Sequence, residues 1–129
     1  MLPFSILSRK EVIKVDFYII PLTSDPNQSL RVTIPVDGRN LTLRLTINYN
    51  EAAGYWTMSI MDDLTDKVLV TSIPLYSGKY PAANLLEQYS YLRIGSAWLV
   101  KVNQDTKSDY PNDMNLGTDF LLMWGDTVE

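Results

Sequence analysis

The amino-acid sequence predicts a mostly β protein, an antiparallel β-sandwich or barrel-like meander with one short α-helix near residues 84–93. Three observations support this prediction. Apolar and polar residues alternate along several stretches, as they do in strands with one buried face. Pro, Gly, Asn and Asp cluster between these stretches, where turns are expected. A helical spacing of apolar residues occurs in one segment only.

The length of 129 residues fits one domain. We expect residues 1–14 to be an N-terminal arm that is ordered only if another surface binds it. Residues 15–129 are expected to form a single β-rich domain. Strands are predicted at residues 15–22, 29–36, 55–62, 67–73, 96–103 and 118–125, with a polar loop at 103–117. The run from Phe17 to Ile20 is apolar at every position, which indicates that both faces of the first strand are covered.

Residues 29–49 are predicted to form a β-hairpin around Asp37-Gly38, a pair typical of two-residue turns. With this turn, the apolar face consists of the pairs Ile34–Leu41, Val32–Leu43 and Leu30–Leu45. A shift of the register by two residues keeps the same faces, whereas a shift by one is disfavoured because it places Ile34 opposite Thr42. Pro35 cannot donate a ladder hydrogen bond, so residues 29–36 are expected at a sheet edge.

The other face of this hairpin pairs Thr33 with Thr42 and Arg31 with Arg44. Like charges directly opposite each other repel. Two interpretations remain open. In the first, the long side chains spread into water at the sheet edge. In the second, an acidic or polar surface of a neighbouring subunit covers them, because burial without an anionic partner is costly. The second interpretation makes all four residues candidates for a protein interface.

The helix near residues 84–93 is predicted from its two ends and its apolar stripe. Asn84 as the N-cap and Glu87 three residues later form a variant of the capping box. Gly95 is expected to end the helix. The apolar stripe consists of Leu85, Tyr89 and Leu92.

Composition excludes several functions. A net charge of -4 argues against a general binder of nucleic acid or anionic membranes, because both need clustered positive charge. The sequence contains no Cys and no His, which removes Ser-His-Asp and Cys-His catalysis and the common zinc sites. We therefore expect no enzymatic activity, no cofactor and no metal. No stretch reaches the roughly 18 apolar residues of a spanning helix. The first residues lack a credible signal peptide, so folding in a cytoplasm is expected.

Two groups of acidic residues suggest further chemistry. The group Asp62, Asp63 and Asp66 could hold a cation, but Asp is an ordinary turn residue and a hairpin turn is favoured. A carboxylate pair in the 103–117 loop could serve glycoside hydrolysis. Contact of that loop with a partner protein is favoured over catalysis. The carboxylates of the loop are Asp105, Asp109 and Asp113.

The aromatic residues indicate either a core or a binding surface. Tryptophans could stack on sugar rings, whereas the competing interpretation is that they fill the core. They are Trp56, Trp98 and Trp124. Tyrosine is enriched at protein interfaces. Further candidate interface residues are therefore Tyr76, Tyr80 and Tyr110.

Short hydrophobic motifs follow one another in a distinctive order along the chain. They are Ile20-Pro21-Leu22, Pro26-Asn27-Gln28 before the hairpin, Gly54-Tyr55-Trp56 leading into Met58-Ser59-Ile60-Met61-Asp62, a second Ile73-Pro74-Leu75, and Leu85-Leu86-Glu87-Gln88-Tyr89-Ser90-Tyr91-Leu92. Over roughly residues 15–125, this order resembles the baseplate plug family of contractile-tailed bacteriophages and their prophage relatives.

The resemblance implies a small structural virion protein at the distal end of the tail tube, made and assembled in the host bacterial cytoplasm. There it would close the channel and contact tail tube, hub and spike proteins. Self-association in a ring or cluster is expected. The family offers no catalytic residues to transfer to this chain. The alternative function is a non-catalytic carbohydrate-binding β-sandwich module involved in host-surface recognition.

Overall fold

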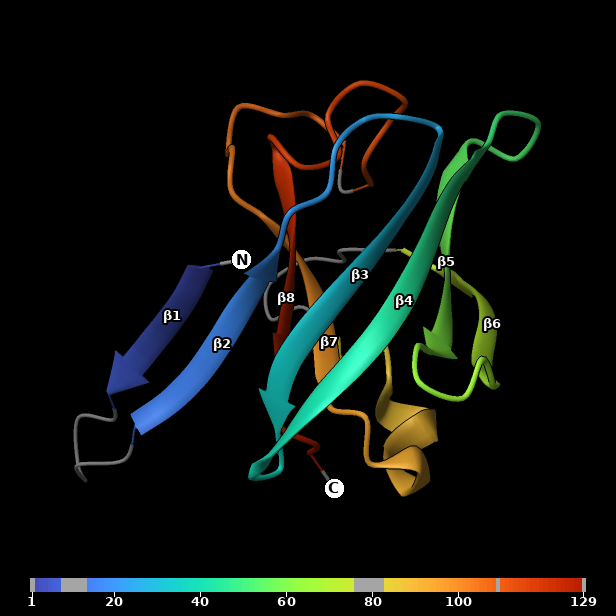
Figure 1. Ribbon diagram of the computed structural model, residues 1–129. Helices are drawn as coiled ribbons and strands as arrows, with labels where there is room; N and C mark the ends of the chain where they lie inside the picture. Colours follow the sequence, from blue (N-terminus) through green and yellow to red (C-terminus); the bar gives the residue numbers. More distant parts are fainter. Residues whose placement is uncertain (1, 8–13, 76–82, 109, 129) are drawn as a thin grey trace.

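Two four-stranded antiparallel sheets form the structure, a computed structural model that describes residues 2–7, 14–75, 83–108 and 110–128 (Figure 1). We call the first the terminal sheet; its strand order is β1 (Leu2–Leu7), β2 (Lys14–Ile20), β8 (Phe120–Gly125) and β7 (Ser96–Lys101). We call the second the meander sheet; its order is β3 (Asn27–Val36), β4 (Arg39–Asn50), β5 (Tyr55–Asp62) and β6 (Val68–Pro74).

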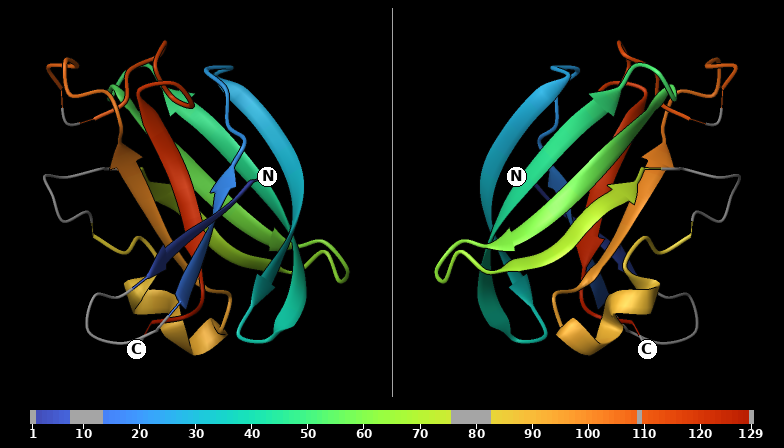
Figure 2. Two further views of the ribbon diagram at one scale, coloured as in Figure 1. Left: turned by 90° about the vertical axis from the view of Figure 1, so that its left-hand side faces the viewer. Right: turned by 90° about the vertical axis from the view of Figure 1, so that its right-hand side faces the viewer.

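The two sheets enclose one hydrophobic core. Figure 2 shows the terminal sheet nearest the viewer on the left and the meander sheet nearest the viewer on the right. Along β3, β4 and β5 every second residue is buried, as the alternation in the sequence predicts. The largest fully buried side chains include Trp56, Met58 and Leu45 from the meander sheet and Trp124 and Phe120 from the terminal sheet. The prediction of a sandwich is therefore confirmed.

The predicted hairpin has the expected register. Ile34 pairs with Leu41 and Arg31 with Arg44. Asp37 and Gly38 have φ of 54° and 80°, and positive φ at both central residues is what a type I′ turn requires. Strand β3 lies at the edge of the meander sheet, as Pro35 predicts.

Part of the predicted N-terminal arm is a strand. Strand β1 pairs antiparallel with β2, with Leu2 opposite Ile19 and Leu7 opposite Lys14. No strand was predicted in this segment, which was expected to be ordered only where another surface binds it; the edge of β2 is the surface that it pairs with. The division of the chain between an arm and a domain at residue 14 stays a prediction.

The predicted α-helix is wrong in type and extent. The segment Glu87–Leu92 is a 3₁₀ helix (η1) with a kink at Tyr89, and Leu86 occupies the N-cap position. Arg93, with φ of 55°, ends the helix, whereas Gly95 was predicted to do so.

Asn84 explains why the segment does not begin as an α-helix. Its Oδ1 accepts hydrogen bonds from the backbone N–H of Leu86 at 3.0 Å and of Ala97 at 3.1 Å. The N–H of Leu85 donates to the carbonyl of Ala97 at 2.7 Å. These contacts fasten residues 84–86 to the outer edge of β7, and the predicted capping box with Glu87 does not form.

The C-terminal residues join the two sheets at one end. Thr127 donates its N–H and its hydroxyl to the carboxylate of Asp37 in the β3–β4 turn, at 2.9 and 2.7 Å. The Asp37 N–H donates to Asp126 Oδ1 at 2.8 Å, and Arg93 Nε lies 3.6 Å from Asp37 Oδ2. Desolvation acts to raise the pKa of Asp37, but the Thr127 hydrogen bonds and the nearby arginines outweigh it. The pKa therefore lies below its usual value.

Candidate interaction surfaces

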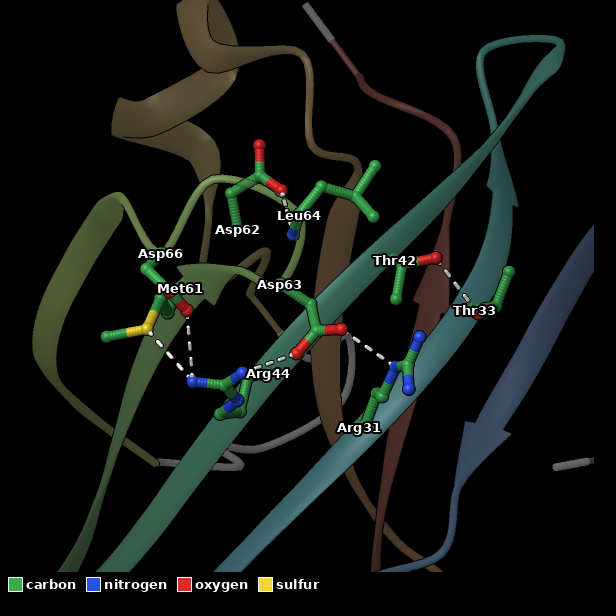
Figure 3. Close-up of polar contacts among 9 residues, drawn as sticks. All are labelled: Arg31, Thr33, Thr42, Arg44, Met61, Asp62, Asp63, Leu64 and Asp66. Atoms are coloured by element: carbon green, nitrogen blue, oxygen red, sulfur yellow. Dashed lines mark hydrogen bonds and ion pairs between the residues drawn. The ribbon is translucent and has the colours of Figure 1, made fainter.

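The polar face of the β3–β4 hairpin is the first candidate surface (Figure 3). Thr33 and Thr42 share a hydrogen bond between their hydroxyls at 3.0 Å. Beside them Arg31 and Arg44 lie opposite each other, with 69% and 42% of their side chains exposed. The structure therefore brings the four hairpin residues predicted from the sequence onto one face.

Asp63 bridges the arginine pair with one carboxylate. Its Oδ2 lies 2.8 Å from Arg31 Nε, and its Oδ1 lies 2.7 Å from Arg44 Nη2. Only 9% of the Asp63 side chain is exposed. Asp66 adds a longer contact, 3.4 Å from Arg44 Nη1, and is 75% exposed. Figure 3 shows the Asp63 carboxylate between the two guanidinium groups.

The β5–β6 turn carries Asp63 to this position. The N–H of Asp63 donates to the carbonyl of Thr42 at 3.2 Å, which continues the β4–β5 ladder by one more contact. The carboxylate of Asp62 accepts the N–H of Leu64 at 3.0 Å and holds the turn. Asp66 has φ of 57°, a left-handed conformation that Asp tolerates better than most residues.

The anion that the arginine pair requires comes from the same chain. From the sequence, the candidates to cover the arginine pair are water or a neighbouring subunit, and the acidic residues 62, 63 and 66 are expected in a separate turn. In the structure the β4–β5 pairing places Arg44 opposite Met61, so Asp63 falls beside Thr42; this position follows only once the register of the two strands is known. An interface role for the hairpin face stays a prediction, but it no longer follows from an uncompensated charge.

The acidic turn itself is a hairpin turn, as favoured from the sequence. The carboxylates of Asp63 and Asp66 contact arginines, and that of Asp62 accepts a backbone hydrogen bond. Within the described ranges, no cluster of three potential metal-ligating acidic residues occurs.

The 103–117 loop is held by residues other than the predicted carboxylates. Asp119 accepts hydrogen bonds from the Thr106 hydroxyl at 2.7 Å and from Asn103 at 3.1 Å, and these bonds lower its pKa. Of the acids considered for hydrolysis, Asp105 and Asp113 are exposed. Asp109 lies outside the described residues.

The structure describes one of the three tyrosines predicted at an interface. Tyr76 and Tyr80 fall outside the described residues. Tyr110 is 50% exposed and stays a candidate.

Two of the three tryptophans fill the core. Trp56 and Trp124 are fully buried, and their ring N–H groups donate to the carbonyls of Asn112 and Ile94 at 2.8 and 2.9 Å. Neither ring face is available for a sugar. Trp98 differs, because it is half-buried in a strand whose neighbouring residues Ala97 and Leu99 are buried. Of the two interpretations left open by the sequence, the core role therefore holds for Trp56 and Trp124 but not for Trp98.

The outer face of the terminal sheet is the second candidate surface, and it is not among the surfaces predicted from the sequence. Half-buried apolar residues alternate with core residues along β2, β7 and β8. The ring of Phe17 meets that of Trp98 edge-on, with centroids 5.3 Å apart. We call this the apolar face; its residues are Phe17, Ile19, Trp98, Val100, Leu121 and Met123. The signal was the apolar character of these strands at successive positions, which was noted only for the first strand.

Comparison with known protein families places the chain in relation to one of them. The model of the family described as "Cyanophage baseplate Pam3 plug gp18" matches residues 17–127, from the middle of β2 to the residues that follow β8. No curated protein sequence matches the chain. Within the described residues, no helix is long and apolar enough to cross a membrane.

Proposed function

The chain belongs to the cyanophage baseplate plug family, and from this membership we propose that it closes the distal end of a tail tube. The family gives the chain a structural role in the tail baseplate of a virion, in association with other baseplate components. In the proposed function its partners are the tail tube, hub and spike proteins, and several copies associate around the channel. Assembly takes place in the cytoplasm of the host bacterium.

The observation that carries the proposal is the extent of the family match, which covers β3 to β8 entirely and β2 from Phe17 onward. The fold is compatible with a passive role. The polar groups with the shortest contacts, such as Asp63 and Asp37, hydrogen-bond or pair with residues of the same chain. They serve the structure of the domain, and we propose no catalytic step for them.

A tagged virion tests the position of the chain. The β4–β5 turn is a suitable insertion point, because residues 51–53 are exposed and lie away from the core. A short epitope inserted there, detected by antibody labelling or electron cryomicroscopy, is expected at the distal end of the tube before contraction. Tagged particles that infect normally provide the control. A tag located on the sheath or the capsid would refute the proposal.

Deletion of the gene tests closure. Particles that lack the chain are expected either to fail in baseplate assembly or to carry a tube that is open at its distal end. Particles that assemble with a closed tube would contradict the proposal.

An assay for hydrolysis tests the absence of catalysis. The purified chain is expected to release no more product from glycan or peptidoglycan than a buffer blank. A rate that disappears in Asp105→Asn, Asp109→Asn or Asp113→Asn would overturn this part of the proposal.

A further inference from the structure

The two outer faces of the sandwich differ in polarity. On the meander sheet, the outward positions of β4 carry Thr42, Arg44, Thr46 and Asn48, as expected for a face in water. On the terminal sheet, the corresponding positions carry the six residues of the apolar face. Figure 2 shows these two sheets facing opposite directions. A contiguous apolar patch on a soluble protein indicates a site of interaction.

The strand register makes the apolar face continuous. Ile19 lies opposite Met123, and Met123 lies opposite Trp98, so one apolar row crosses three strands. Val100 and Leu121 form a second row beside it. The contact between Phe17 and Trp98 spans β8 and closes one end of the patch. Because the residues come from three paired strands, the strand ladders fix their spacing on this surface.

The strands at the sheet edges are poorly suited to association. Pro3 in β1 and Pro35 in β3 lack the N–H that an added strand would need. Strand β6 contains a register shift and ends at Pro74. The outer edge of β7 is bonded to Asn84 and Leu85. Contact through a face is therefore favoured over the addition of a strand.

Charge indicates which partner fits the apolar face. The chain carries a net charge of -4, so two copies repel each other through most surfaces. From Phe17 onward, the outward positions of β2, β7 and β8 hold no Asp, Glu, Lys or Arg. Two copies can therefore meet here without placing like charges together. A charged partner protein would find no ion-pairing group on this face.

We propose that a second copy of this chain packs its terminal sheet against the apolar face. This inference refines the self-association in the proposed function and rests on it for its biological setting. The contact is a face-to-face packing of two sheets, which lie about 10 Å apart in such arrangements.

The area of the face predicts a weak contact. With three strands of six or seven residues, about 3.3 Å per residue and about 4.8 Å between strands, the apolar face covers roughly 300 Å². A standard stable interface takes about 800 Å² from each partner. A reversible dimer is therefore expected in dilute solution, strengthened where the baseplate holds several copies together.

Sedimentation velocity of the purified chain tests the proposal. We compare wild type, Met123→Glu and Thr46→Glu over roughly 1 to 500 µM, a range in which a small interface associates. Met123 is half-buried in β8, an inner strand of the terminal sheet; Thr46 is half-buried in β4, an inner strand of the meander sheet. Both changes add one negative charge to an outward position, so Thr46→Glu controls for charge and folding.

Wild type and Thr46→Glu are expected to sediment faster as concentration rises. For Met123→Glu, the dissociation constant of the contact between copies is expected to be at least tenfold higher. Circular dichroism verifies folding, and Val100→Glu replaces Met123→Glu if the latter unfolds. Quenching of Trp98 fluorescence by acrylamide should decrease as wild type associates, since the other two tryptophans are buried. A wild type that remains monomeric, or a folded Met123→Glu that associates like Thr46→Glu, would overturn the proposal.

Two further outcomes separate this inference from the proposed function. If wild type is monomeric but Met123→Glu fails to enter virions, another baseplate protein covers the apolar face and the second-copy proposal is wrong. If wild type associates as expected but the epitope tag is absent from the distal end of the tube, the proposed function fails and the contact between copies remains.

Discussion

Replacing Asp63 by Asn tests whether its carboxylate stabilises the fold by bridging the two arginines. The change keeps the size of the side chain and removes the charge that Arg31 and Arg44 contact at 2.8 and 2.7 Å. A hydrogen bond to a charged group contributes about 1.5–3 kcal/mol. The arginine side chains are 69% and 42% exposed, so solvent compensates part of the loss. We expect the free energy of unfolding to fall by about 1–2 kcal/mol.

Thermal unfolding measures this loss. With about 2.1 cal/mol/K of unfolding entropy per residue, a chain of 129 residues should lose about 4–7 °C in Tm. Asp66→Asn is the matched control: it removes the same charge, but Asp66 is 75% exposed and 3.4 Å from Arg44. Its expected cost is below about 0.5 kcal/mol. High salt should narrow the difference between the variants. Equal Tm values for both variants at low salt would refute the assigned role of Asp63.

Three other changes test the contacts that shape the fold. Because the pKa of Asp37 is lowered by folding, its contribution to stability is present above its unfolded pKa and lost as the pH falls through the folded pKa. In urea unfolding, the free energy of unfolding of wild type should therefore exceed that of Asp37→Asn at neutral pH, and this difference should shrink below about pH 4. A difference in the free energy of unfolding that is constant with pH would count against this. Gly95→Ala should cost about 3 kcal/mol or more, because φ is +103° and the new Cβ would lie 2.5 Å from the Trp124 ring nitrogen. Gly54→Ala, with open space around it, is the control, and equal losses in thermal unfolding would contradict the steric argument. Asn84→Ala should cost about 1–3 kcal/mol, because two backbone N–H groups lose their acceptor. Asn84→Asp keeps that acceptor and should lose less in the same assay, so equal destabilisation would be evidence against the bonding role.

The predicted hairpin shows how far local patterns determine structure. Its register follows from alternation along residues 29–49 and from a turn whose two central residues tolerate positive φ. Both signals act between residues close in sequence. The edge position of β3 follows from a missing N–H at Pro35, which is a property of that residue alone.

The η1 segment and the contacts of Asp63 show what such local patterns do not predict. Asn84 and Glu87 have the spacing of a capping box. In the structure, however, the Asn84 side chain accepts a hydrogen bond from the N–H of Ala97 in β7. The position of Asp63 depends on three strands at once, because it reaches across β4 to Arg31 in β3. Neither contact is visible in the periodicity of one segment.

The sequence by itself determined that the fold is mostly β and that His and Cys chemistry is absent, and the order of its motifs resembles the plug family, which the family match shows. Those properties depend on residue types, on period-two alternation and on turn residues, all of which are local. Only the tertiary structure decided that β2, β7 and β8 adjoin and that Trp98 and Met123 share an outer face. The pairing of β2 with β8 joins residues about a hundred positions apart. The free energy that selects such a pairing comes from burial of the whole core, which no single segment contains.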